Sequence, residues 1–91
     1  MIHAAFLTII DQEKNMAHRP AHLEYLSRLF DQGKVIMAGP FTDGKGGLVL
    51  YKTETVEEAR ELAEQDPVVL HGARTLELRE WKPLQFPIEL A

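Results

Sequence analysis

The stretch IHAAFLTII, residues 2–10, is rich in β-branched and large apolar side chains and contains neither Gly nor Pro. It predicts a β-strand that ends at the polar run Asp11–Asn15. Both alternating sets of its side chains are mainly apolar: Ile2, Ala4 and Phe6 on one side, and Ala5, Leu7 and Ile9 on the other. Both faces of the sheet that contains this strand therefore need cover.

A first helix is predicted over residues 19–32. Arg19-Pro20 opens it in this reading, because proline lacks the N–H that the first helical turn leaves unbonded anyway, and its φ is already helical. Leu23, Leu26, Leu29 and Phe30 follow at helical spacing, and Gly33 supplies a residue type that commonly ends helices.

A second helix is predicted from Val56 to about Gln65. Thr55 and Glu58 have the capping-box spacing, in which the hydroxyl accepts from a free backbone amide and the glutamate reaches back. Asp66-Pro67 ends this helix, since the residue before a proline is forced out of the α conformation, and a loop follows through Gly72.

Three more strands are predicted over residues 34–41, 48–52 and 74–81, with simple alternation placing Val35 and Met37 on one face. The order strand, helix, strand, strand, helix, strand is that of the ferredoxin-like βαββαβ fold. We therefore expect one α+β domain over residues 1–91 with a four-stranded antiparallel sheet. Residues 82–91, which contain two prolines, are expected to form an irregular arm.

Two helices can cover only one face of such a sheet, while the first three strands carry apolar side chains on both faces. A second copy of the chain is the simplest cover, and it predicts a homodimer of the dimeric α+β barrel type. The alternative is a monomer in which the tail residues Leu84, Phe86 and Ile88 fold over the open face.

The composition excludes several classes of protein. Of 91 residues, 45% are hydrophobic and 26% are charged, which is typical of a globular protein. A net charge of -4 with scattered Lys and Arg argues against nucleic-acid binding. No apolar run is long enough to span a bilayer and no secretion signal is visible, so a cytoplasmic location with no membrane partner is expected. The absence of cysteine excludes thiol chemistry.

His22 is the first candidate for chemistry, because it lies four residues before Leu26 and seven before Leu29, on the inward face of the first helix. Asp66 could orient its imidazole, since the two helices pack side by side in this topology. Both residues could also have purely structural roles, because an inward histidine is often structural and an aspartate before proline often caps a turn.

Other candidates carry weaker signals. Gly39 and Pro40, followed by Phe41, let the chain turn and approach a ligand closely, and Arg19 could hold an anionic group. His18 and His22 have the spacing of two zinc ligands, but a third ligand is missing. We therefore expect no metal site.

At this point the chain resembles the YCII-related family over about residues 2–82. The resemblance rests on the order and spacing of these features: Arg19-x-x-His22-Leu23-x-x-Leu26, Gly33, Ala38-Gly39-Pro40, Glu57-Glu58-Ala59, Asp66-Pro67 and Trp81. It implies a dimeric fold similar to that of muconolactone isomerase, with a functional pair carried over to His22 and Asp66. Family members with known activity include a dehydrochlorinase acting on a chlorinated hydroxyhydroquinone.

These observations predict a small enzyme without a cofactor. His22 held by Asp66 would move a proton in an isomerisation or elimination of a small, ring-containing anion. Arg19, Gly39, Pro40 and Phe41 would bind that substrate. Two alternatives stay open: a dimer that binds a small metabolite in a sensor or accessory role, and a cofactor-free monooxygenase.

Overall fold

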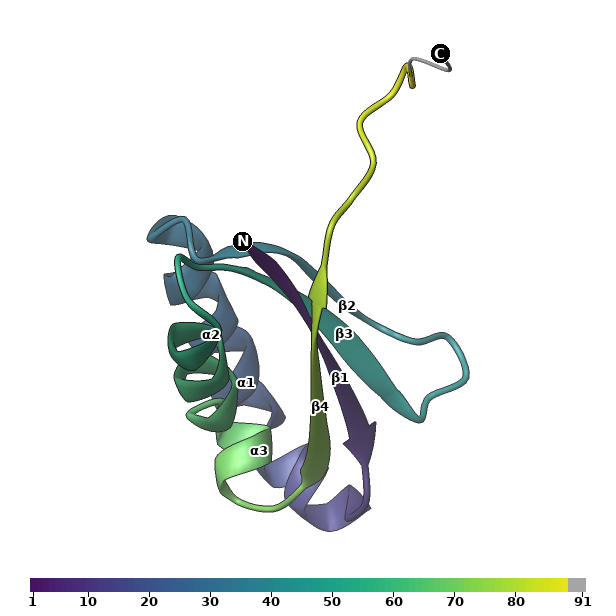
Figure 1. The fold of residues 1–91 in the computed structure, drawn as a ribbon. Coiled ribbons are helices and arrows are strands. Elements are labelled where there is room, and N and C mark those ends of the chain that lie inside the picture. Colours follow the sequence, from purple (N-terminus) through teal and green to yellow (C-terminus); the bar gives the residue numbers. More distant parts are fainter. Residues whose placement is uncertain (89–91) are drawn as a thin grey trace.

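The computed structural model describes residues 1–88 and contains four strands and three helices (Figure 1). Their bounds are β1 (Ile2–Ile9), α1 (Gln12–Asp31), β2 (Val35–Pro40), β3 (Gly46–Lys52), α2 (Val56–Glu64), α3 (Pro67–Leu70) and β4 (Arg74–Trp81). The βαββαβ order predicted from the sequence is confirmed, with α3 as an addition to it.

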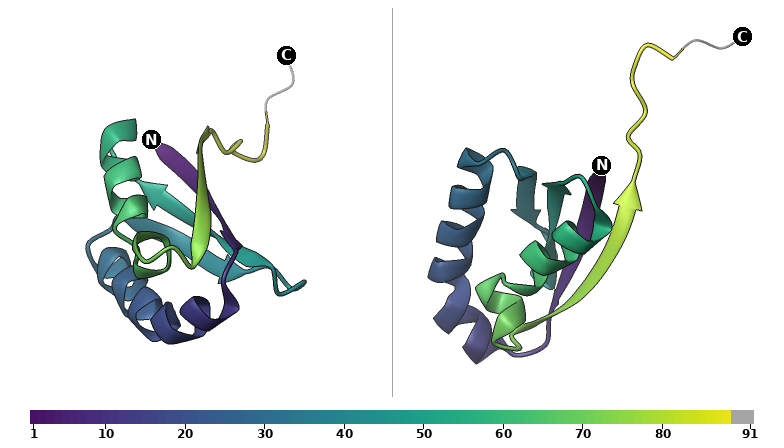
Figure 2. Two further views of the ribbon diagram at one scale, coloured as in Figure 1. Left: turned by 90° about the horizontal axis from the view of Figure 1, so that it is seen from below. Right: turned by 60° about the vertical axis from the view of Figure 1, so that its left-hand side comes forward.

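The four strands form one antiparallel sheet in the order β2-β3-β1-β4. β1 is central: its residue Ala5 lies opposite Val49 of β3 on one side and Leu78 of β4 on the other. All three helices cover the same face of this sheet, which both views of Figure 2 show. The ferredoxin-like α+β prediction is therefore confirmed.

The predicted start of the first helix was wrong, because α1 begins at Gln12 rather than at Arg19. Asp11 caps the helix by accepting a hydrogen bond from the backbone N–H of Lys14 at 3.0 Å. Pro20 therefore lies inside the helix, where it cannot donate to the carbonyl of Met16. Met16 is exposed, so water can take that bond, and the helix continues without a break.

A short helix, α3, occupies part of the segment that was predicted to be a loop. Asp66 ends α2 as expected and begins α3, with Pro67 in its first turn. Its side chain accepts a hydrogen bond from the N–H of Val68 at 3.2 Å, and its carbonyl accepts from the N–H of Leu70 at 2.8 Å. Asp66 is thus fixed by local backbone geometry.

β2 contains an irregularity that reverses its predicted alternation. Val35 pairs with Tyr51, whereas Met37 pairs with Leu50, so one residue is extra between them. Val35 consequently faces the helices and is buried, while Met37 points to the opposite face and is exposed. The prediction that both share a face was wrong, because a bulge shifts the two-residue period by one.

The core lies between the sheet and the helices. Its buried apolar members come from the six elements other than β4 and from the loop before β4, and they are Ala5, Leu7, Leu26, Leu29, Val35, Val49, Tyr51, Ala63, Val68 and Ala73. Leu76 and Leu78 of β4 are partly buried and pack against them. The residues that alternate with them on the strands face away from the helices. Among the described residues, no helix has the length and apolarity that crossing a membrane would require.

The C-terminal arm leaves the body of the domain after β4 (Figure 1). Residues 82–88 belong to no helix or strand, as the sequence predicted, and residues 89–91 of the predicted arm lie outside the described residues. Leu84 and Phe86 are 70% and 77% exposed, so the arm does not fold over its own sheet as the monomer alternative required.

Candidate active site

His22 and Asp66 are in direct contact although 44 positions separate them in the chain. The Nδ1 atom of His22 lies 2.8 Å from both carboxylate oxygens of Asp66. α1 directs His22 toward the sheet, and the turn into α3 brings Asp66 beneath it. Both are buried, with 6% of His22 and 0% of Asp66 exposed. The helix layer thus brings an imidazole and a carboxylate into contact inside the domain.

The surroundings of Asp66 fix which ring nitrogen of His22 carries a proton. An ionised carboxylate can only accept hydrogen bonds, and Asp66 also accepts one from the N–H of Val68. When the carboxylate is ionised, Nδ1 is the N–H that donates to Asp66. In the neutral ring, Nε2 then has a free lone pair and is the nitrogen available to a ligand.

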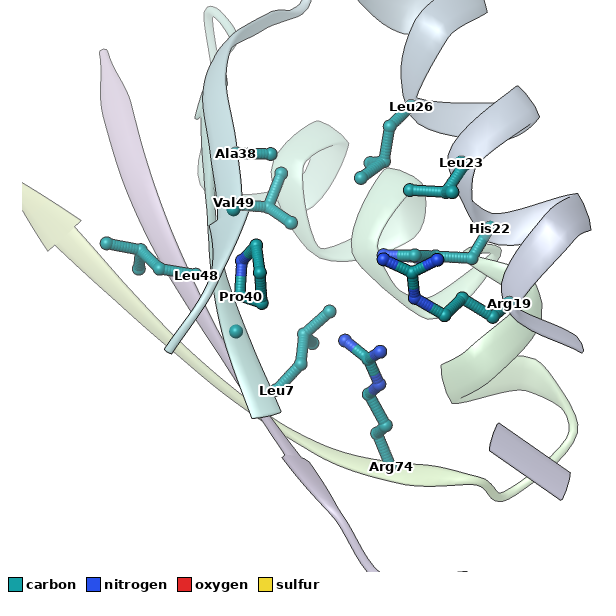
Figure 3. A pocket seen from close by; sticks show the side chains of 12 residues that line it. Leu7, Arg19, His22, Leu23, Leu26, Ala38, Pro40, Leu48, Val49 and Arg74 are labelled. Atoms are coloured by element: carbon teal, nitrogen blue, oxygen red, sulfur yellow. The ribbon is translucent and has the colours of Figure 1, made fainter. Parts of the chain in front are cut away.

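A cavity of about 150 Å³ adjoins His22 between α1 and the sheet (Figure 3). Its wall is mostly apolar and combines α1, the first three strands and one residue of β4, as follows: Leu7, Arg19, His22, Leu23, Leu26, Ala38, Gly39, Pro40, Gly47, Leu48, Val49 and Arg74. The polar groups are concentrated at the end where His22 and the two arginines lie. A small pocket with a few convergent polar groups is typical of a ligand site.

The structure brings together most of the residues that the sequence singled out. Arg19, Gly39 and Pro40 line the cavity with His22, and Asp66 lies behind that histidine. Phe41 does not line it. Its N–H donates to the carbonyl of Gly46, which continues the strand ladder beyond Pro40, so alternation turns its side chain away from the helices.

Arg74 is a lining residue that the sequence reasoning missed. It is the first residue of β4, and only 9% of it is exposed. Its Nε donates to Oδ1 of Asn15 at 2.7 Å. Burial lowers the pKa of Arg74 and the charge of Arg19 lowers it further, whereas the charge of Asp66 opposes them. The signal in the sequence was its spacing of two and four residues before Leu76 and Leu78, which places it on their face.

The pKa values of two tyrosines reflect the buried surroundings of Asp66. Burial raises the pKa of Tyr25 above its usual value of 10.0, and the negative charge of Asp66 raises it further. The same two causes, in the same order, raise the pKa of Tyr51. The Tyr25 hydroxyl donates to the carbonyl of Leu62 at 2.7 Å, which ties α1 to α2. Both phenols are therefore neutral structural neighbours of the pair.

His18 does not line the cavity. Its ring stacks on that of His71, with centroids 4.1 Å apart and planes 7° from parallel. Within residues 1–88, no three His, Cys, Asp or Glu side chains gather closely enough to hold a metal ion. The two histidines that had the spacing of zinc ligands therefore lie in different environments, one stacked and one bonded to a carboxylate.

Fold and site together define a class: a ferredoxin-like α+β domain with a buried histidine–aspartate contact at a small cavity. The chain belongs to the YCII-related domain family, whose model matches residues 1–82. It is 37% identical to the uncharacterized protein YjpA of Bacillus subtilis over 76 residues, which are 84% of this chain and 89% of YjpA. It is 36% identical to protein YciI of Escherichia coli over 70 residues, or 66% of this chain and 71% of YciI.

A solved structure shares the fold. It is 5-chloro-2-hydroxyhydroquinone dehydrochlorinase (TftG) from Burkholderia phenoliruptrix, in complex with 2,5-dihydroxybenzoquinone. The TM-score is 0.77 with 21% sequence identity, and the match covers 90% of this chain and 94% of that one. The likeness establishes the common architecture of the two proteins.

Proposed function

We propose that the protein is a small cofactor-independent enzyme in which His22, oriented by Asp66, moves protons on a ring-containing anionic substrate. The observation that carries the proposal is the 2.8 Å contact between Nδ1 and the Asp66 carboxylate, which leaves Nε2 as the free base beside the cavity. The carboxylate also stabilises the imidazolium that forms when Nε2 takes a proton.

The chemistry available to such a pair is proton transfer. Nε2 takes a proton from a phenolic oxygen or an activated carbon, and the released electron pair moves into the ring. If the proton returns to a different atom, the result is an isomerisation. If a chloride leaves with its electron pair, the net result is loss of HCl. Neither outcome requires an oxidant.

Two observations support a ring-containing substrate. A cavity of about 150 Å³ can hold one benzene-sized ring. The structural neighbour of the same fold is a dehydrochlorinase bound to 2,5-dihydroxybenzoquinone, a six-membered ring with acidic oxygens. Pro40, Leu7 and Val49 would contact the faces of such a ring, and Arg19 would contact an oxygen.

The test uses 2,5-dihydroxybenzoquinone as a probe, with exchange of its ring hydrogens for deuterium followed by proton NMR. We expect the protein to accelerate the exchange, and His22→Gln to reduce that acceleration by about 10²–10⁴-fold, the usual contribution of general acid–base catalysis. Glu24→Gln, an exposed change on the same helix, is the control. Full exchange activity in His22→Gln contradicts the proposal, and binding without exchange in the wild type supports the non-enzymatic alternative.

We also propose that two chains associate through the sheet face that the helices leave open. This face has a groove of about 300 Å³ lined by Ala4, Phe6, Leu48, Leu50, Arg79, Glu80 and Trp81. The proposed occupant of this groove is a second copy of the chain. The C-terminal arm also carries large apolar side chains that the rest of the same chain leaves exposed, and a second copy could cover them too. Two such faces packed together would remove both sets of side chains from water.

Sedimentation equilibrium tests the association. We expect a dimer for the wild type and a monomer for Leu50→Glu, because that change places a charge in the centre of the apolar face. Glu24→Gln, an exposed change on α1 and thus on the opposite side of the sheet, is expected to leave the dimer intact. A monomeric wild type at all accessible concentrations would contradict the proposed dimer.

A further inference from the structure

We infer that Arg74, held in place by Asn15, binds an anionic oxygen of the ligand and so sets the orientation of the ring before His22. The inference deepens the proposed function, on which it rests for the location of the site, by naming the substrate class: a small carboxylate, phenolate or enolate. It assigns a specificity role to Arg74 and a positioning role to Asn15.

The first observation is that Arg74 is buried without a carboxylate partner of its own. Nine-tenths of the residue is removed from solvent, yet within residues 1–88 its one side-chain hydrogen bond goes to the neutral amide oxygen of Asn15. Buried charges in proteins are normally paired, because desolvating them alone is costly. The carboxylate of Asp66 is in contact with His22 and influences Arg74 only through its charge, at a distance.

The second observation is that a second arginine faces the same space. Arg19 comes from α1 and Arg74 from β4, and their guanidinium ends approach the cavity from different walls (Figure 3). Burial lowers the pKa of Arg74, and the nearby charge of Arg19 lowers it further. Two cations at the polar end of the cavity, one buried and one exposed, create an environment that an anion stabilises.

The third observation is the way in which Asn15 holds Arg74. Asn15 is buried on the same face of α1 as His22, seven residues before it. Its side-chain oxygen accepts the hydrogen bond that Nε–H of Arg74 donates. The two terminal nitrogens of the guanidinium are then left for the ligand. They form the edge that binds a carboxylate through two parallel hydrogen bonds.

The test measures binding of benzoate and of phenol to the whole chain by isothermal titration calorimetry at neutral pH. The two probes have the same ring, but only benzoate is charged. We expect Arg74→Gln to weaken benzoate binding by roughly 10–100-fold and to leave phenol binding within about twofold, since a hydrogen bond to a charged group is lost. Arg60→Gln, an exposed arginine on α2, is the control.

Asn15→Asp provides a second variant that leaves Arg74 in place. The new carboxylate would pair with Arg74 and neutralise it, so benzoate binding should fall while phenol binding persists. Unchanged benzoate affinity in both variants, or a wild type that binds phenol but not benzoate, would overturn the inference. A wild type that binds benzoate through Arg74 but catalyses no proton exchange would instead leave the inference standing and reject the acid–base function.

Discussion

The two faces of the sheet differ in how far their side chains are buried and hydrogen-bonded. On the helix face, His22, Asp66, Asn15 and Arg74 are buried and engaged in hydrogen bonds around a cavity. On the open face, large side chains such as Trp81 and Met37 are 49% and 67% exposed. One face is organised for a ligand, and the other has the character of a contact surface.

β1 shows how one strand serves both faces. Leu7 lines the cavity, while its neighbour Phe6 lines the groove on the opposite side. Along β1, strand alternation separates the two surfaces, so substitutions of Phe6 and of Leu7 should affect different properties. The site and the proposed dimer contact can therefore be altered independently.

The largest effect is expected from a pair of leucine truncations. Leu29→Ala removes a side chain buried between α1 and the sheet, and it should lower the free energy of unfolding by about 2–4 kcal/mol at any protein concentration. Leu50→Ala, on the open face, should cost less than about 1 kcal/mol in dilute solution and more at high concentration, where a dimer would form. Urea titrations at two concentrations measure both.

Equal and concentration-independent losses in the two variants would remove the distinction between the faces. They would mean that Leu50 contributes to the subunit's own core in the same way as Leu29.

A smaller effect is expected from Tyr25→Phe, which breaks the hydrogen bond from Tyr25 to the carbonyl of Leu62 and should cost about 1 kcal/mol. Burial and the Asp66 charge raise the pKa of Tyr25 above 10.0, so the folded chain resists a deprotonation that the unfolded chain allows. The wild type should therefore lose stability more steeply than the variant as the pH rises above 10.0. If the free energies of unfolding of the two proteins changed with pH in the same way, the raised pKa of Tyr25 would be contradicted.

The smallest effect concerns the rim of the helix layer, where Nζ of Lys34 lies 2.6 Å from Oε2 of Glu58. The bond to Lys34 holds the pKa of Glu58 below its usual value of 4.5. A lowered folded-state pKa contributes stability above pH 4.5 that disappears as the pH falls through the folded value. Thermal melts of Glu58→Gln should thus differ slightly from wild type at neutral pH and match it in acid.

The element order, the sheet and the closing strand were all predictable, because apolar periodicity and turn residues act locally. Two errors came from effects that periodicity cannot register. Pro20 was taken as a helix start, although α1 continues through it beside the exposed residue Met16. The bulge after Val35 shifted the alternation of β2, and a bulge leaves no mark in a pattern of polar and apolar residues.

The site was predictable in part. His22 followed from its position among the inward leucines, and Asp66 from the proline after it. Their contact depends on how α1 and α3 pack, a non-local result that no spacing encodes. Arg74 was missed because charged residues are usually placed at the surface, although its alternation with Leu76 and Leu78 pointed inward.

The central claim, that Asp66 holds His22 with its proton on Nδ1, is tested most directly by nitrogen–proton NMR correlation of the imidazole rings at a pH where histidines are neutral. We predict for His22 a protonated Nδ1 with a downfield proton, and an unprotonated Nε2, with the pattern altered in Asp66→Asn. His22→Gln assigns the signal. A His22 that carries its proton on Nε2, or whose signals are the same in Asp66→Asn, would contradict the account.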